Sequence, residues 1–303
     1  MRDFVRETAD LPPDLPGTTS GEWTLIDGLR VQFAHAGTGP ALVLVHGLLG
    51  YSFSWRQVIP SFAGRFEVFA PDLPGTGFSD CDPRLDCCLT SAARRLLGFL
   101  DAVGIGSCDL VGSSYGGTTA LMLAALASSR IRRLVLVSPA NPWSRLGRIR
   151  LALLRNRVPA MLFPIVARPM RPLHDLFLRR MWGNPRRITP EVYRGYSAPL
   201  RRQGTLEHAV KIVRTWKEDM RDLQAVLPQL RNVPTLLVWG SKDRAVDAAS
   251  AEPLRSNFQS AQFAVIEGAG HLPYEECPEE FVRIVNGFLQ SSSASGGADR
   301  EVT

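Results

Sequence analysis

The chain has 303 residues, with 35 lysines and arginines against 29 aspartates and glutamates, a formal net charge of +6. Its composition, 45% hydrophobic and 21% charged, excludes a disordered or fibrous chain, and its length allows one large core to be buried. The sequence contains no secretory signal, membrane-spanning stretch, CxxC pair or zinc-ligand spacing, so we expect a reduced, cytoplasmic protein.

The predicted elements alternate between strands and helices along most of the chain. Residues 1–20, rich in proline and polar residues, are expected to form an irregular arm, and the low-complexity residues 291–303 a mobile tail. The last helix begins at Pro278 and carries an apolar stripe. This alternation predicts an α/β protein with a doubly wound, mostly parallel sheet. The predicted strands are Leu29–Ala36, Ala41–Val45, Phe66–Ala70, Cys108–Val111, Arg133–Val137, Thr235–Trp239 and Gln262–Ile266.

The alternation stops at residues 141–230, where no strand is predicted and several helices are. Thr189-Pro190-Glu191 indicates a capped helix start, and a later helix has an apolar face from Leu206 to Val213. This segment holds 18 lysines and arginines against 6 aspartates and glutamates, leaving 17 against 23 elsewhere. We therefore expect an acidic core, formed by residues 21–140 and 231–290, and a basic helical cap at 141–230.

The strongest chemical signal is the motif Gly112-Ser113-Ser114-Tyr115-Gly116, placed between a predicted strand and a predicted helix. A sharp strand-to-helix turn lifts its central residue clear of the sheet and leaves room only for glycine two positions away on either side. Ser114 is therefore the expected exposed hydroxyl, and Ser113 is excluded by register.

A serine hydroxyl needs a base, and the base needs a carboxylate to orient it. His271 lies in a glycine-rich loop directly after the last predicted strand, and Asp243 follows the preceding one, so both belong at the carboxyl edge of the sheet. The other candidates are favoured as structural residues: Asp247 as a helix cap, Asp72 as the organiser of a glycine turn, and His35, His174 and His208 as packed or solvated histidines.

Over nearly its whole length the chain resembles the α/β-hydrolase superfamily, through the serine motif, the order Ser114, Asp243, His271, and His46-Gly47 after an early strand. The resemblance implies an oxyanion hole formed by the backbone N–H groups of Leu48 and Tyr115, with no metal or organic cofactor. Serine at the motif's centre departs from the aspartate of dehalogenases and epoxide hydrolases. Ser113 and Leu272 replace the asparagine and tryptophan that many carbon–carbon hydrolases of the superfamily have there.

We therefore expect a carboxylesterase that forms an acyl-enzyme on Ser114 and acts on a small ester with an apolar acyl group. The alternatives are a monoacylglycerol-type lipase or thioesterase, then a carbon–carbon hydrolase or a non-catalytic ligand receptor. Oligomeric state is left open.

The basic cap suggests two kinds of partner. Its stretch 146–170 is apolar with interspersed arginines, which favours weak contact with a membrane or lipid interface, or recognition of an anionic substrate such as an acyl-CoA. Nucleic acid is not expected, because no recognition motif is present.

Overall fold

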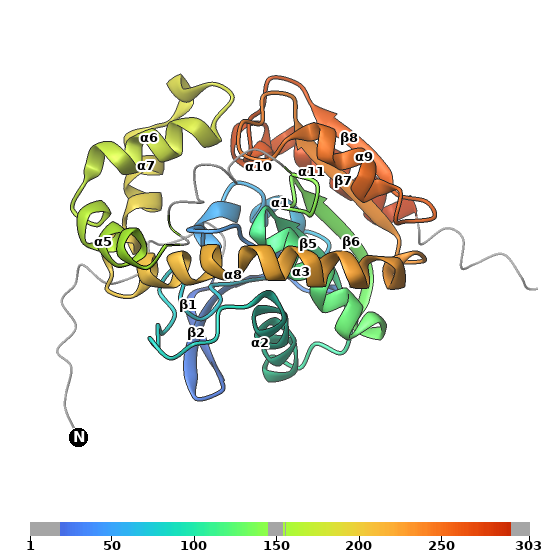
Figure 1. The fold of residues 1–303 in the computed structure, drawn as a ribbon. Helices are drawn as coiled ribbons and strands as arrows, with labels where there is room; N and C mark the ends of the chain where they lie inside the picture. Colours follow the sequence, from blue (N-terminus) through green and yellow to red (C-terminus); the bar gives the residue numbers. More distant parts are fainter. Residues whose placement is uncertain (1–18, 145–153, 155, 292–303) are drawn as a thin grey trace, which may run out of the picture.

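The computed structural model describes residues 19–144, 154 and 156–291 (Figure 1). Most of the expected N-terminal arm, nearly all of the expected tail and the first part of the apolar stretch 146–170 lie outside these residues. Among the helices that the structure describes, none is both long and apolar enough to span a membrane.

One eight-stranded sheet forms the centre of the molecule, with the strand order β1-β2-β4-β3-β5-β6-β7-β8. β1 pairs antiparallel with β2, and β2 pairs antiparallel with β4, whereas every pairing from β4 to β8 is parallel. The mostly parallel sheet expected from the sequence is thus confirmed. Its strands are β1 (Thr19–Ile26), β2 (Leu29–Ala36), β3 (Ala41–Val45), β4 (Glu67–Pro71), β5 (Cys108–Ser113), β6 (Ile131–Val137), β7 (Thr235–Gly240) and β8 (Gln262–Ile266).

Strand β1 was not among the predicted elements, and it begins two residues inside the range expected to be irregular. It is an edge strand, and its side chains Trp23 and Leu25 are exposed while Ile26 is buried. A strand with one solvated face and mixed polarity lacks the continuous apolar run that marks the central strands.

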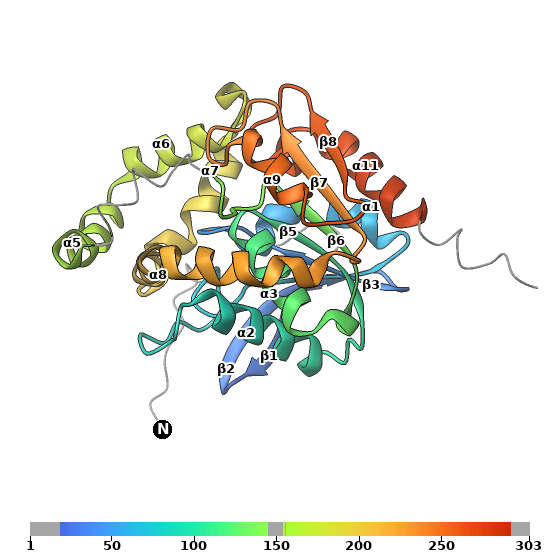
Figure 2. The same cartoon turned by 45° about the vertical axis from the view of Figure 1, so that its right-hand side comes forward.

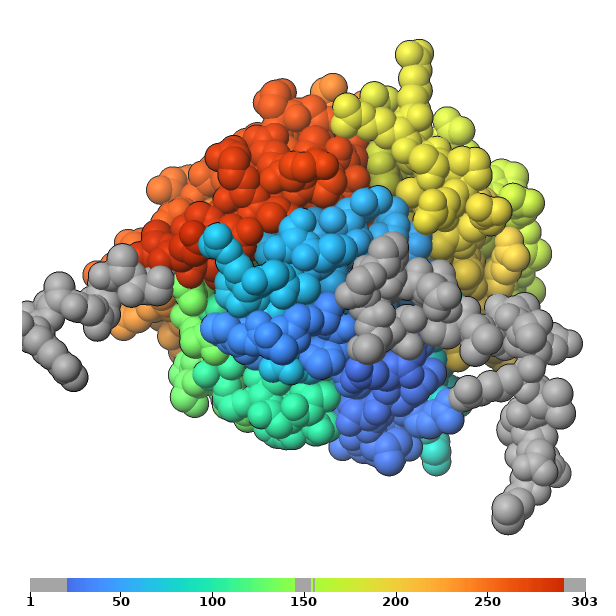
Figure 3. All heavy atoms as spheres, turned by 180° about the vertical axis from the view of Figure 1, so that it is seen from behind, coloured from blue at the N-terminus to red at the C-terminus, as the bar shows by residue number. Residues whose placement is uncertain are grey.

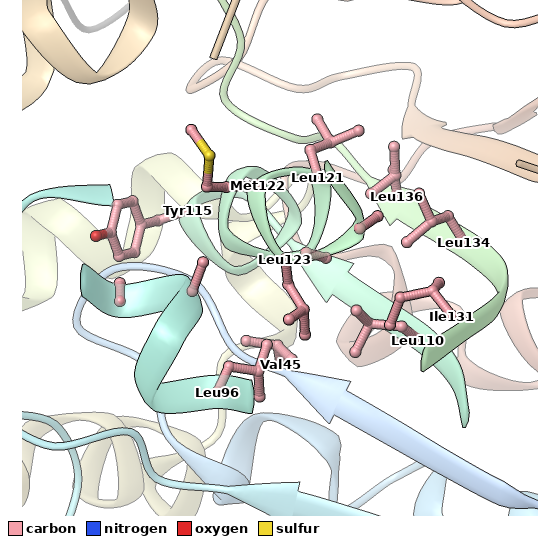
Figure 4. Packing of buried hydrophobic residues seen from close by; sticks show 14 of the residues in the cluster. Val45, Leu96, Leu110, Tyr115, Leu121, Met122, Leu123, Ile131, Leu134 and Leu136 are labelled. Carbon is pink, nitrogen blue, oxygen red and sulfur yellow. The ribbon is translucent and has the colours of Figure 1, made fainter. Parts of the chain in front are cut away.

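Helices cover both faces of the sheet (Figures 1 and 2). Helices α2 (Leu89–Ala102), α3 (Tyr115–Leu126) and α9 (Ala251–Arg255) share one apolar cluster with one face of the sheet. Helices α1 (Ile59–Ala63) and α11 (Pro278–Ser291) belong to a second cluster on the other face. Figure 4 shows side chains of α2, α3 and the parallel strands meeting between helix and sheet, where Leu123 points toward Val45 and Leu96. This packing positions β5 and α3 on either side of the serine motif.

Among the described residues between β6 and β7, four α-helices are inserted: α5 (Arg157–Ala167), α6 (Arg171–Met181), α7 (Pro190–Ser197) and α8 (Thr205–Val226). The Thr189 hydroxyl caps α7, as its sequence indicates, by accepting a hydrogen bond from the Val192 N–H. The long helix α8 contacts α5 at one end and packs along α2 and α3 at the other. Seen from behind, the inserted residues lie on one side of the molecule, next to the C-terminal part of the core (Figure 3). We call residues 156–226 the inserted helices below.

Candidate active site

Ser114 occupies a sharp turn between β5 and α3. Its backbone angles, φ 52° and ψ −119°, are strained for a residue with a side chain. A Cβ on Gly112 would lie 2.5 Å from the Gly116 carbonyl oxygen, and one on Gly116 would overlap the carbonyl groups of Val45 and His46. Both glycines are therefore required by close backbone approach, as the motif predicts.

The two serines of the motif have different surroundings. Ser113 is fully buried, and its Oγ accepts a hydrogen bond of 3.1 Å from the Tyr274 hydroxyl. Ser114 is partly exposed. Of the two hydroxyls, only that of Ser114 is open to a substrate.

Asp243 and His271 meet at the carboxyl edge of the same sheet. The loop after β7 carries Asp243, the loop after β8 carries His271, and Nδ1 of the histidine lies 2.8 Å from Oδ2 of the aspartate. Both side chains are almost completely buried, at 4% and 1% exposure. Ser114 leaves the end of β5, two strands away from β7. All three predicted residues thus lie at one edge of the sheet.

The Asp243 carboxylate is held in its charged form. Burial by itself favours the neutral acid, but the His271 ring and the N–H groups of Ala245 and Val246 outweigh it and lower the pKa of Asp243 below its usual value. Asp247, the alternative acid, instead accepts a hydrogen bond from the Ala249 N–H and caps a short 3₁₀ helix.

The turn at His46-Gly47 lies against Ser114. A Cβ on Gly47 would be 3.1 Å from the Ser114 Cβ and 3.7 Å from its Oγ. The Gly50 N–H closes this turn on the Gly47 carbonyl at 2.9 Å, and Leu49 takes a positive φ of 62°. Tyr115 is the first residue of α3, so no preceding helical turn can accept its N–H. The backbone on both sides of Ser114 therefore comes from the segments expected to supply Leu48 and Tyr115 as donors.

The remaining histidines have structural environments. Burial lowers the pKa of His46 to about 4, and its Nε2 accepts a hydrogen bond from the Leu73 N–H. Burial likewise lowers the pKa of His208 to about 4, and its ring contacts the Cys87 thiol at 3.3 Å. His174 bonds to the Ala167 carbonyl within the inserted helices, and His35 lies beside Glu67 on the sheet.

Asp72 organises the glycine turn in which it stands. Its buried carboxylate accepts hydrogen bonds from the N–H groups of Ser52, at 2.7 Å, and Phe78, at 2.9 Å. A Cβ on Gly77 would overlap this carboxylate. The structural role predicted for Asp72 is confirmed.

Glu276 is a further residue beside the candidate triad, and no catalytic motif of the sequence assigns it a role. Its buried carboxylate accepts three backbone hydrogen bonds: from Gly270 at 2.6 Å, from Gly183 at 2.9 Å and from Asn184 at 3.0 Å. The His271 N–H also donates to the Met181 carbonyl, at 2.7 Å. The histidine loop is thus fastened directly to the inserted segment after α6. These partners are about ninety positions apart in sequence, and no local pattern signals their contact.

Two hollows lie near these elements. A small cavity of about 20 Å³ lies beside the His46-Gly47 turn and is lined by His46, Leu48, Tyr115 and His208, among others. An open hollow of about 860 Å³ lies between α8 and residues 85–88, and none of Ser114, Asp243 and His271 lines it. Within the described ranges, no group of three or more His, Cys, Asp or Glu side chains is arranged to hold a metal ion.

The chain is similar to known proteins over most of its length. It is 29% identical over 274 residues to 2-hydroxy-6-oxo-6-phenylhexa-2,4-dienoate hydrolase of Burkholderia cepacia, which covers 87% of this chain and 92% of that protein. The crystal structure of Cfl2 from Burkholderia cenocepacia superposes with a TM-score of 0.81 and 26% identity, over 92% of this chain and 98% of the other. That of a membrane phospholipase A, a bacterial virulence factor, gives a TM-score of 0.75 and 25% identity, over 91% and 87% of the two chains.

The sequence model of the α/β-hydrolase fold matches residues 40–278, a range that begins just before β3 and includes Ser114, Asp243 and His271. With the strand order, the strained serine turn and this match in agreement, the chain belongs to the α/β-hydrolase fold family.

Proposed function

We propose that this hydrolase cleaves carboxylic esters through an acyl-enzyme on Ser114. The Ser114 Oγ attacks the acyl carbon, and His271 takes its proton and passes it to the leaving alcohol. The N–H groups of Leu48 and Tyr115 bind the developing oxyanion. A water molecule, activated by the same histidine, then releases the acid.

The proposal is supported by one observation: a strained, partly exposed Ser114 lies at the same sheet edge as a buried, hydrogen-bonded His271–Asp243 pair. The carboxylate fixes the histidine tautomer, because Nδ1–H donates to Oδ2 and Nε2 is left free to act as the base. A chain that only bound ligands would need neither the strained turn nor this ordered pair.

An apolar acyl group suits the side chains around the His46-Gly47 turn, which are apolar in large part and include Leu73 and Ile212. The cavity of about 20 Å³ beside this turn has room for a single water at most, so the acyl chain itself has to lie outside it.

A carbon–carbon hydrolase is the second candidate, because the Burkholderia cepacia relative is an enzyme of that kind. A phospholipase A among the structural neighbours favours esters instead. The two can be separated by a substrate panel of p-nitrophenyl esters of increasing acyl length, monoacylglycerols, acyl thioesters and a vinylogous diketone. Ester turnover well above diketone turnover supports the proposal, and the reverse order replaces it with carbon–carbon hydrolysis.

The direct test compares Ser114→Ala with Ser113→Ala, the same change one residue away. We expect Ser114→Ala to lower ester turnover by at least about 10⁴-fold and to abolish labelling by a fluorophosphonate. Ser113→Ala, which removes only a buried hydroxyl, should keep the labelling. Labelling that survives in Ser114→Ala would contradict the assignment, and no labelling of the wild-type chain would favour a non-catalytic receptor.

A further inference from the structure

Helix α5 exposes a face of large apolar side chains. Val158, Met161 and Ile165 are 63%, 66% and 63% exposed, and Leu162 and Val166 about half exposed. Their spacing places all five on one side of the helix, since a helix turns once every 3.6 residues. We call these five residues the α5 face. The exposed side chains Met170, Leu176 and Phe177 continue the apolar surface onto α6.

The α5 face points away from the body of the protein. The buried residues of the helix are Ala160, Pro164 and Ala167, which the same periodicity places on its opposite side. Small residues therefore pack α5 against its neighbours while the large ones face outward. Amphipathic helices that pack on a core normally do the reverse, so this surface is built to meet something else.

The surroundings of the α5 face are strongly basic. Residues 156–181 contain five arginines and a single carboxylate, that of Asp175, which is paired with Arg179 at 2.7 Å. Helical periodicity places Arg157 and Arg168 along one border of the face, but Arg168 is already paired with Glu207 of α8, which leaves Arg157 as the exposed cation there. Arg171, at the start of α6, is exposed and lies over the Tyr193 ring. Apolar side chains bordered by arginines match the acyl region and the phosphate groups of a lipid interface.

We propose that the α5 face docks on the surface of an anionic phospholipid bilayer. Its apolar side chains enter the headgroup boundary, and the exposed Arg157 and Arg171 lie at the level of the phosphates. Contact of this kind is peripheral, in agreement with the absence of a membrane-spanning helix from the described residues. Docking does not depend on the chemistry at Ser114. Experiments can therefore refute ester hydrolysis without refuting membrane binding, and can refute membrane binding without refuting ester hydrolysis.

Vesicle flotation tests the proposal with the full chain. We expect the wild type to float with phosphatidylcholine vesicles containing 30% phosphatidylglycerol, and at least tenfold less with phosphatidylcholine alone. Met161→Glu with Ile165→Glu should lower binding to the anionic vesicles by at least tenfold. Arg157→Gln with Arg171→Gln should lower it by about fivefold per arginine. The matched control is Leu25→Glu, because Leu25 is 64% exposed on β1, outside the inserted helices. This variant should bind the anionic vesicles as the wild type does.

A second measurement covers the case of a glutamate variant that folds poorly. An environment-sensitive fluorophore on Ile165→Cys should shift its emission to the blue when anionic vesicles are added, and one on Leu25→Cys should not. The proposal is overturned if the wild type stays unbound, if both labelled positions respond alike, or if the glutamate variants bind undiminished. Sedimentation that shows a lipid-free dimer lost in Met161→Glu would also overturn it, because a second copy of the chain would then cover the face.

Discussion

The hydrolase core and the inserted helices bury their apolar side chains to very different extents. The largest fully buried side chains of the described structure, among them Trp55, Trp239 and Phe281, all belong to the core. The inserted helices have a small apolar cluster of their own around Ala167, Leu200 and Leu206, while the exposed α5 face belongs to them as well. The core is therefore held by its own packing, whereas the inserted helices bury less apolar surface among themselves and rely more on their contacts with the core.

The largest difference should appear when the same substitution is made in both regions. Leu44, in the central strand β3, is fully buried, whereas Leu162 is 46% exposed on α5. Leu44→Ala should lower the free energy of unfolding by about 2–5 kcal/mol, because it leaves a cavity. Leu162→Ala should change it by less than about 0.5 kcal/mol. Urea unfolding measures both values, and equal losses would show that the α5 face is buried in solution.

An intermediate effect is expected where the two regions are joined. In Glu276→Gln, an amide NH₂ replaces one of the two accepting oxygens, so at least one of the N–H groups of Gly183, Asn184 and Gly270 loses its partner. We expect a loss of about 1–3 kcal/mol in stability. We also expect kcat to fall about 10- to 100-fold, because the His271 loop is no longer held in position.

The control for this variant is Glu279→Gln, an exposed glutamate in the first turn of α11. It removes the same charge three residues away and should leave both stability and kcat nearly unchanged. A Glu276→Gln enzyme with wild-type kcat would mean that the core alone positions His271.

A smaller effect should follow from pH, because His46 of the core and His208 of α8 line the same small cavity. Burial lowers the pKa of each to about 4, so between pH 6.5 and 4 the unfolded chain binds more protons than the folded one. Each histidine thus removes stability as the pH falls, by about 1.4 kcal/mol per pH unit. Asp72 acts in the opposite direction, because burial raises its pKa to about 6 and the folded chain takes up its proton first.

The contribution of His208 can be isolated by substitution: between pH 6 and 4.5 we expect the wild type to lose stability more steeply than His208→Gln, by up to about 1.4 kcal/mol per pH unit. Urea midpoints at several pH values measure the slope, and His208→Gln should flatten it. A slope unaffected by His208→Gln would mean that the joint between α8 and the core does not respond to acid.

The sequence predicted best what depends on local pattern. The central strands are continuous apolar runs, and the candidate triad residues each follow a strand, so their common sheet edge could be inferred from parallel pairing alone. The glycines beside Ser114 could be predicted for the same reason, since the turn itself demands them.

What the sequence could not supply depends on contacts between distant segments. The hydrogen bonds that the Gly183 and Asn184 N–H groups donate to Glu276 join two segments whose sequences give no sign that they meet. The exposure of the α5 face could not be predicted either. Periodicity shows that apolar residues share one side of a helix, but it does not show whether that side faces the protein or the solvent. Strand β1, with its mixed polarity, lacked a signal altogether.

The close approach of two backbone segments at the histidine loop limits which sequences could replace the inserted helices. A Cβ added to Gly183 would lie 2.7 Å from the Gly270 nitrogen. A Cβ added to Gly270 would lie 2.6 Å from the carbonyl carbon of Trp182. A foreign insertion between β6 and β7 that follows the same path past the histidine loop would need a glycine at this crossing. The shape of the insertion is free to vary, but this one backbone crossing must be kept.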